Sequence, residues 1–181
     1  MERLDSIQKI LIIRSATHIF HKAVNFLKDL YPEAEISVLT PSDFAPQLKR
    51  DARITEVFSS LHKGHFSLFK LSRDIKDKIK NRRYDLVVTL YNNDSGMGYL
   101  NVDLITLYFR SKYIMAFNNI NECFFVTENY IAKKFFMETI NKFSCVFSIF
   151  IFSIVFVIIT ITLLTTDCVR KFYLIRCRNS L

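Results

Sequence analysis

Two polar loops hold the side chains of this chain that could do chemistry. Residues 14–18 read Arg-Ser-Ala-Thr-His and directly follow an apolar run. Within this loop His18 is a candidate general base, because imidazole titrates near neutral pH. A loop histidine that merely begins a helix is the simpler interpretation of His18, and the sequence leaves both open.

The second loop, residues 92–98, reads Asn-Asn-Asp-Ser-Gly-Met-Gly. Its exposed backbone donors, its glycines and the helix expected after it suit a phosphate or a sugar hydroxyl. The side chain of Asp94 or Ser95 could equally be an ordinary cap of that helix. This loop is therefore a binding candidate whose residues also have a purely structural explanation.

Other chemistries have less support. His62 and His65 would need a further ligand to hold a metal, and no pattern supplies one, so we expect no metal site. The four cysteines show neither metal-ligand spacing nor a disulfide pattern. The net charge of +8 suits anionic lipid, a phosphorylated substrate or nucleic acid, but no nucleic-acid recognition motif accompanies the basic run at residues 80–83. We therefore expect no nucleic acid and no cofactor.

Apolar runs and amphipathic segments alternate along residues 9–118, which is typical of a parallel sheet with crossover helices. Strands are expected at residues 9–15, 35–40, 54–60, 85–90 and 112–118. Helices are expected at residues 18–32, 42–50, 69–84 and 99–109. The predicted fold class is α/β, with a Rossmann-like, mostly parallel five-stranded sheet. Ligands of such sheets bind beyond the carboxyl ends of the strands, which is where the two polar loops are expected.

A C-terminal segment has a different character. Residues 143–166 carry no charge and lie between Lys142 and Asp167. About 20 apolar residues suffice for a helix to cross the hydrocarbon core of a bilayer. A buried core helix is the alternative, but this segment is apolar on all sides and has no polar face for solvent. We therefore expect a transmembrane helix.

Basic residues flank this segment on both sides, so the positive-inside rule does not fix its direction. The N-terminus is too polar for a signal peptide. We therefore expect the first domain in the cytoplasm and the helix either single-pass or monotopic. An amphipathic connector is expected before the span, where Lys133, Lys134 and Lys142 fit a lipid surface. The expected parts are a domain at 1–118, the connector at 119–142, the span at 143–166 and a basic tail at 167–181.

The order of these segments and their amino-acid sequences resemble the N-terminal half of the heptosyltransferase-like glycosyltransferases, family 9 of the GT-B enzymes. The family combines a first strand that ends in Arg, a Tyr-Pro passage after the first helix, and a basic helix that runs into a Tyr-Asp-Leu strand. The resemblance covers roughly residues 8–118. Its passages are KILIIR at 9–14, LKDLYPEAEISVLTPSDFAPQLKRDARITEVF at 27–58 and IKNRRYDLVVTLYNNDSGMG at 79–98.

The resemblance implies a GT-B scaffold, in which a first Rossmann-like domain binds a sugar acceptor and a second binds an activated sugar nucleotide. Only the first domain is expected here. The family's first loop also holds a Gly and a catalytic Asp, and residues 14–18 have neither. General-base catalysis typically contributes about 10²- to 10⁴-fold in rate. Whether the chain is an active hexosyl or heptosyl transferase is therefore left open.

Two functions follow from the resemblance. In the first, the chain is a membrane-anchored, acceptor-side half-domain in glycan or lipopolysaccharide-type synthesis, working beside membrane lipid with a separate donor-binding glycosyltransferase subunit. In the second, it is an inactive, truncated family member that acts as a membrane-bound binding or scaffold protein. A longer enzyme with a donor domain encoded downstream is a third alternative. In the first function, a sugar or lipid-linked acceptor would contact Arg14, Ser15, Thr17, Asn93, Asp94 and Ser95.

Overall fold

The computed structural model confirms the α/β fold class. It describes residue 4, residues 6–60 and residues 67–178, with side chains up to residue 162. The chain forms two compact units, Met1–Phe135 and Phe136–Leu181. His62 and His65, the candidates weighed above for a metal, lie outside the described residues.

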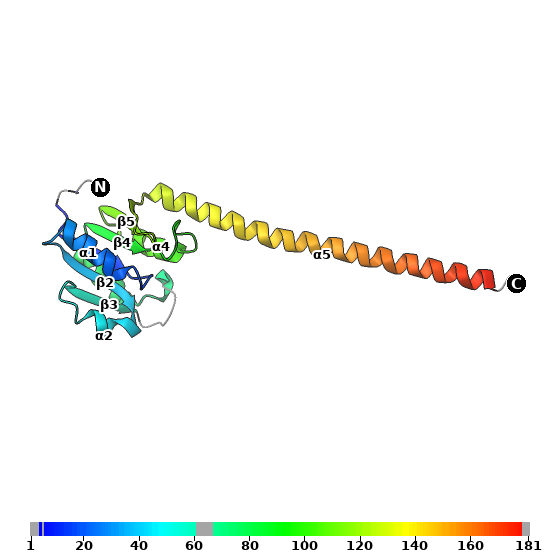
Figure 1. Ribbon diagram of the computed structural model, residues 1–181, viewed down its shortest axis with the longest axis horizontal. Coiled ribbons are helices and arrows are strands. Elements are labelled where there is room, and N and C mark those ends of the chain that lie inside the picture. The colour runs from blue at the N-terminus through cyan, green and yellow to red at the C-terminus, as the bar shows by residue number, and fades with distance from the viewer. Residues whose placement is uncertain (1–3, 5, 61–66, 179–181) are drawn as a thin grey trace. The chain divides into compact units, whose positions relative to one another are not determined.

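One sheet forms the centre of the first unit, with the strand order β3-β2-β1-β4-β5-β6 (Figure 1). The five predicted strands are all present and pair in parallel. A sixth, β6, pairs antiparallel with β5 within the segment assigned above to a connector. Three residues are too few to show a period of two in a sequence. The strands are β1 (Lys9–Ile13), β2 (Glu35–Pro41), β3 (Glu56–Ser60), β4 (Leu86–Leu90), β5 (Tyr113–Phe117) and β6 (Cys123–Phe125).

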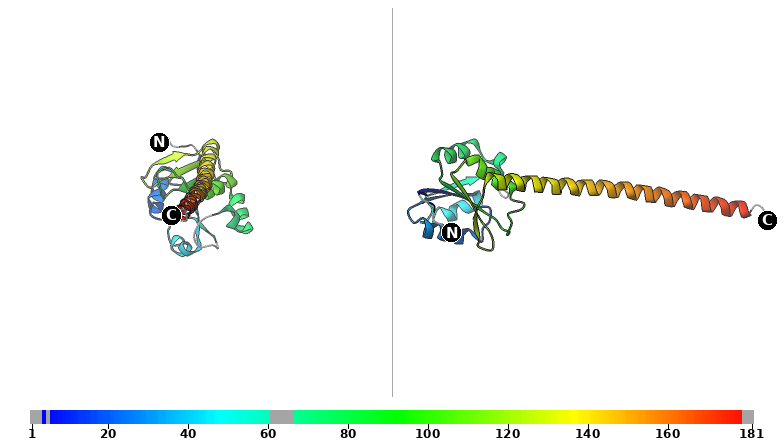
Figure 2. Two further views of the ribbon diagram at one scale, coloured as in Figure 1. Left: turned by 90° about the vertical axis from the view of Figure 1, so that its right-hand side faces the viewer. Right: turned by 90° about the horizontal axis from the view of Figure 1, so that it is seen from above.

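Helices cover both faces of this sheet (Figure 2). Successive residues of β1 point to opposite faces, so Ile10 and Ile12 pack in a core with the helices α1 (Phe20–Leu30) and α2 (Ala45–Leu48). Leu11 and Ile13 pack in a second core with α3 (Arg73–Arg82) and α4 (Leu100–Phe109). The central strands are buried on both sides, which explains why they read as continuous apolar runs. Two 3₁₀ turns, η1 (Ser42–Phe44) and η2 (Leu68–Lys70), complete the connections.

The last helix, α5 (Glu128–Arg178), contributes its first turns to the first unit. Ile131 packs there with Tyr91. The ammonium of Lys134 lies 2.5 Å from a carboxylate oxygen of Asp103, and both side chains are buried. The expectation that Lys134 lies at a lipid surface is therefore wrong. The charge of Lys134 predicts a surface position in a helix. The sequence cannot reveal that α4 places a buried carboxylate opposite this lysine.

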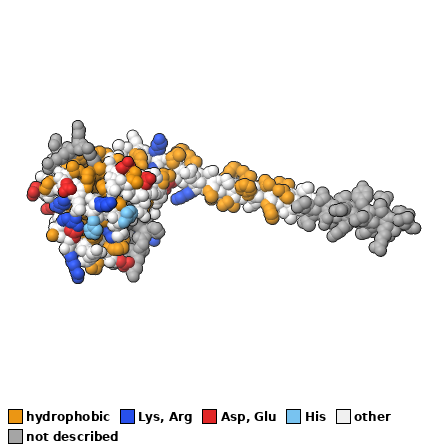
Figure 3. All heavy atoms as spheres, in the orientation of Figure 1, with side chains coloured by type: hydrophobic (Ala, Val, Ile, Leu, Met, Phe, Trp, Pro, Cys, Tyr) orange, Lys and Arg blue, Asp and Glu red, His pale blue; other side chains and the backbone are white. Residues whose placement is uncertain are grey.

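The second unit contains the remainder of α5, and the large apolar side chains described there, up to residue 162, are exposed. Phe152 is 75% exposed and Phe156 is 72% exposed. Figure 3 shows hydrophobic side chains along the described part of this helix. The segment Glu128–Thr162 reaches a mean hydropathy of 2.8 in its most apolar window, and by length and composition it could cross a membrane.

Candidate functional site

The backbone leaves β1 at the place where the strand order reverses. The amide of Arg14 donates a hydrogen bond to the carbonyl of Leu39 at 2.9 Å, on the neighbouring strand β2. The hydroxyl of Ser15 donates to the carbonyl of Leu90, on the other neighbour, β4. The first polar loop is thus tied to both strands that flank β1. In open α/β sheets this is the position at which ligands bind.

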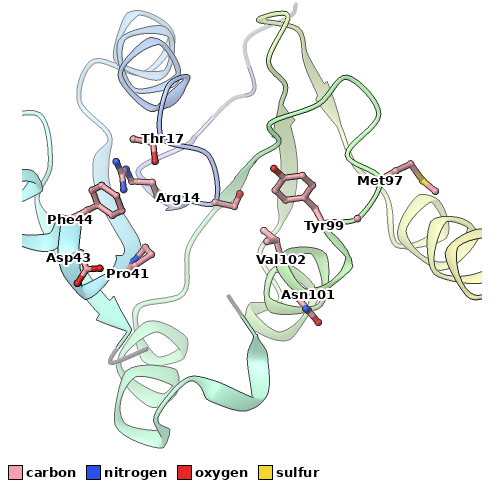
Figure 4. A pocket seen from close by; sticks show the side chains of 11 residues that line it. Arg14, Thr17, Pro41, Asp43, Phe44, Met97, Tyr99, Asn101 and Val102 are labelled. Atoms are coloured by element: carbon pink, nitrogen blue, oxygen red, sulfur yellow. The ribbon is translucent and has the colours of Figure 1, made fainter. Parts of the chain in front are cut away.

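A pocket of about 450 Å³ opens beside this loop (Figure 4). One wall comes from the loop after β1 and from η1, which follows β2. The other wall comes from the end of the second polar loop and the start of α4. The lining residues are Arg14, Ser15, Thr17, Pro41, Asp43, Phe44, Met97, Gly98, Tyr99, Asn101 and Val102.

Arg14 is the most unusual of the lining residues, because its side chain is charged yet only 6% exposed. The guanidinium carbon lies 4.0 Å from the ring centre of Phe44 and 5.4 Å from that of Phe20. Its Nε is buried without a hydrogen-bond partner within the described part of the chain. Burial lowers the pKa of Arg14 from its usual value, because removal from water disfavours the charged form.

Tyr99 forms part of the opposite wall. Its hydroxyl accepts a hydrogen bond from the amide of Asn92 at 3.1 Å. Its ring packs beside that of Tyr91, with 5.4 Å between ring centres. The phenol oxygen of Tyr99 therefore has one role in the loop and retains a proton with which it can donate to a ligand.

The second polar loop is held by its own side chains. Asn93 accepts from the amide of Gly96 at 2.7 Å and donates to the carbonyl of Met97 at 2.8 Å. Gly96 has a φ of +68°, which favours glycine. A Cβ at this position would lie 2.6 Å from the ring of Tyr91. The loop therefore packs against Tyr91 by close backbone approach.

A buried polar cluster supports the same loop from beneath. The hydroxyl of Tyr91 donates to one carboxylate oxygen of Asp103 at 2.5 Å, and Lys134 donates to the other. The ammonium of Lys134 also lies 4.6 Å from the ring centre of Tyr91. Nearby, the hydroxyl of Tyr130 donates to the carbonyl of Ser95 at 3.3 Å. The first turns of α5 thus contact both the loop and its support.

The predicted site residues separate into two groups. Arg14, Ser15 and Thr17 come together at the pocket. His18 is exposed in the turn before α1 and does not line it. The set Asn93, Asp94 and Ser95 shapes the second loop without lining the pocket. The roles of all these residues toward a ligand stay predictions.

The alternative that Asp94 or Ser95 caps the next helix is wrong. Helix α4 begins at Leu100, and its N-cap is Tyr99, which makes no side-chain cap hydrogen bond. The helix begins close to the expected start at residue 99, because Gly96 and Gly98 both have positive φ and turn the chain before the helix can start.

The sequence reasoning missed the wall that follows β2. Pro41, Asp43 and Phe44 line the pocket from there. The sequence carries a signal for this wall, because the strand at β2 ends at the same edge of the sheet as β1 and β4. Asp43 brings a carboxylate to the pocket that the first polar loop lacks.

Comparisons with known proteins give little further information. The sequence matches no protein-family model and no curated protein. A similar solved structure is that of ADP-heptose LPS heptosyltransferase II from E. coli, at 19% identity and a TM-score of 0.44. The match covers 61% of this chain and 30% of that protein. The Rossmann-like assignment therefore rests on the strand order and packing of the chain itself.

Proposed function

We propose that this chain is a membrane-anchored, acceptor-binding half-domain of a sugar-transfer system. The observation that carries the proposal is the pocket at the strand-order reversal, where Arg14 and Thr17 face an aromatic side chain, Tyr99. Hydroxyl and guanidinium donors beside aromatic rings suit a ligand with many hydroxyl groups and apolar ring faces. A sugar has both features.

The donor sugar nucleotide, in this proposal, binds to a separate polypeptide. The described residues form one sheet, with one pocket at the edge where the strand order reverses. In this proposal the acceptor occupies that pocket. A partner subunit would place its donor site opposite this edge. The resemblance to the heptosyltransferase-like enzymes, which pair two Rossmann-like domains across a cleft, supports this arrangement.

Helix α5 would hold the domain at the membrane that carries the acceptor, with the domain on the cytoplasmic side. Exposed apolar side chains along the second unit support this part of the proposal. Anchoring raises the local concentration of a lipid-linked acceptor at the pocket. A maleimide that cannot cross membranes tests the orientation. A cysteine introduced at Lys49, which is exposed in the first unit, should react only after the membrane is permeabilised so that the reagent reaches the cytoplasmic side.

Asp43 is the residue we assign as general base in this system. It lines the pocket as a carboxylate, whereas His18 does not line it. Replacement of a general base lowers the rate by about 10²- to 10⁴-fold. We therefore expect Asp43→Asn to reduce transfer by this factor and His18→Gln to leave it unchanged.

The test uses membranes from cells that carry the gene and from cells in which it is deleted. Incorporation of labelled sugar from a panel of sugar nucleotides into the lipid fraction should fall on deletion and return with the wild-type chain. Purified chain reconstituted alone should show no transfer. Transfer by the chain alone would contradict the separate donor subunit, and unchanged transfer after deletion would favour a binding or scaffold role.

A further inference from the structure

Arg14 differs from the cations that form ion pairs within the described part of the chain. Lys134 is buried and paired with Asp103, while Arg53, Lys78 and Arg82 lie closer to solvent and each pairs with a carboxylate. Arg14 is buried to a similar degree as Lys134, yet no ion pair with a described carboxylate includes it. No carboxylate among the residues that the structure describes therefore compensates the charge of Arg14.

A buried arginine without an ion-pair partner destabilises the fold unless a ligand supplies the opposite charge. A buried charge without a partner loses its hydration and regains no ion pair. Contact with Phe44 and Phe20 offsets part of this loss through the ring faces, but it satisfies no N–H group. An apolar side chain of the same length would pack there without the penalty, so stability alone does not explain an arginine.

The guanidinium is also positioned as a ligand-binding group. The ring of Phe44 lies against it and restricts its plane, and the backbone of Arg14 is fixed to β2 at the edge of the pocket (Figure 4). Thr17, whose side chain is exposed, lines the same wall. A planar guanidinium recognises two oxygens of a phosphate or carboxylate at once.

We propose that the pocket binds an oxyanion carried on a sugar, with the phosphate or carboxylate group at Arg14 and the sugar ring toward Tyr99. This inference rests on the proposed function, and it narrows the acceptor from sugars in general to anionic sugars. The oxyanion completes the missing ion pair of Arg14. Phosphate and carboxylate share this chemistry, and direct binding measurements separate the two.

The experiment measures binding of three probes to the full chain by calorimetry, in a polyoxyethylene detergent that carries neither sugar nor charge. The probes are glucose 1-phosphate, glucuronate and glucose. We expect at least one anionic probe to bind about tenfold or more tightly than glucose, because charge-assisted hydrogen bonds are the strong ones. Equal binding of glucose and both anions, or binding of none of them, would overturn the proposal.

Arg14→Met provides the decisive variant, because methionine keeps an apolar stem against Phe44 without the charge. We expect it to lose the preference for the anionic probe, while its melting temperature without ligand equals or exceeds that of the wild type. Arg14→Lys should retain a weaker preference, because lysine keeps the charge but not the planar fork. Arg50→Gln, at an exposed site outside the pocket lining, is the matched control and should bind like the wild type.

A preference for the anionic probe that survives in Arg14→Met would also overturn the proposal. If the Met variant fails to fold, the thermal shift that the anionic probe gives to wild type and to Arg14→Lys still tests it, because a ligand of the native state raises its stability. The outcome is separable from the proposed function. Sugar transfer to a neutral acceptor in membranes, without oxyanion binding by the chain, would support the proposed function and contradict this inference. Oxyanion binding without any sugar transfer would support this inference and contradict the proposed function.

Discussion

Gly96 and Gly98 are two residues of one loop that meet different constraints. Both have positive φ, but a Cβ on Gly96 would lie within 3 Å of the Tyr91 ring, whereas a Cβ on Gly98 would meet nothing within 4 Å. We expect Gly96→Ala to destabilise the fold by about 2–5 kcal/mol, from backbone strain and overpacking together. Gly98→Ala should cost about 1–2 kcal/mol, from backbone strain alone. Urea unfolding of the two variants measures the difference, and equal losses would contradict the close approach to Tyr91.

Two buried tyrosines make stability depend on alkaline pH. Burial raises the pKa of Tyr84 to about 12, and burial also raises the pKa of Tyr91. Their neutral forms are thus favoured in the native state, while in the unfolded chain they ionise near pH 10. The resulting stabilisation is complete below about pH 10 and is lost as the pH rises through the native pKa values.

Titration by tyrosinate absorbance measures this effect. We expect exposed tyrosines to ionise first, and Tyr84 and Tyr91 to ionise later or together with unfolding. Tyr84→Phe should remove one late-titrating group and reduce the loss of stability above pH 10. A single transition near pH 10 for every tyrosine, with the fold still intact, would rule out their burial.

Among the elements, α4 and the first turns of α5 are joined by the ion pair of Asp103 and Lys134. Removal of one partner from a buried pair typically costs about 3–5 kcal/mol, because the other charge stays buried without the opposite charge of that pair. We expect Asp103→Asn and Lys134→Met each to destabilise the first unit by that amount, and the double variant by less than the sum. Denaturant unfolding of the four proteins gives the coupling energy.

The exposed pair of Asp74 and Lys78 on α3 is a matched comparison within one helix. Its removal should cost no more than about 0.5 kcal/mol, because solvent screens it. Additive losses for Asp103 and Lys134 would mean that they do not interact in solution, and the first turns of α5 would then need another explanation for their packing.

Element type was largely predictable from sequence, and the packing partners were not. The runs around β1 and β4 read as buried strands because both faces of the sheet are covered, so hydrophobicity is unbroken along them. The alternation of these strands with amphipathic helices then fixed the fold class. Lys134 shows the limit, because a buried lysine and a surface lysine look alike until a partner such as Asp103 is located on another helix.

The residues of the candidate site were also predictable from the sequence only in part. Arg14, Ser15 and Thr17 were predictable because they follow the first strand, and the fold class places that loop at the ligand-binding edge. The position of the turn after β2 was predictable on the same ground. The contacts of Phe44 and Tyr99 in the pocket were not, because they depend on how this turn and the second loop fold back. Asn93 was predicted to contact a ligand, but its side-chain amide forms hydrogen bonds within its own loop.

The whole molecule joins a Rossmann-like domain to a helix that could span a bilayer, and its proposed role requires the two together. The helix has exposed apolar side chains throughout the described part of the second unit. A charged residue at the centre of a membrane helix costs about 2.5–3.5 kcal/mol on insertion scales. We therefore expect Phe152→Lys with Phe156→Lys to weaken membrane insertion strongly while the pocket remains intact.

Retention in membranes tests the central claim most directly. Membranes that contain the full chain are washed with alkaline carbonate, and the pellet and supernatant are compared with those of the double lysine variant. The account predicts that the wild-type chain stays in the pellet until detergent is added, and that the variant is released. Recovery of the folded wild-type chain in the supernatant without detergent would contradict it.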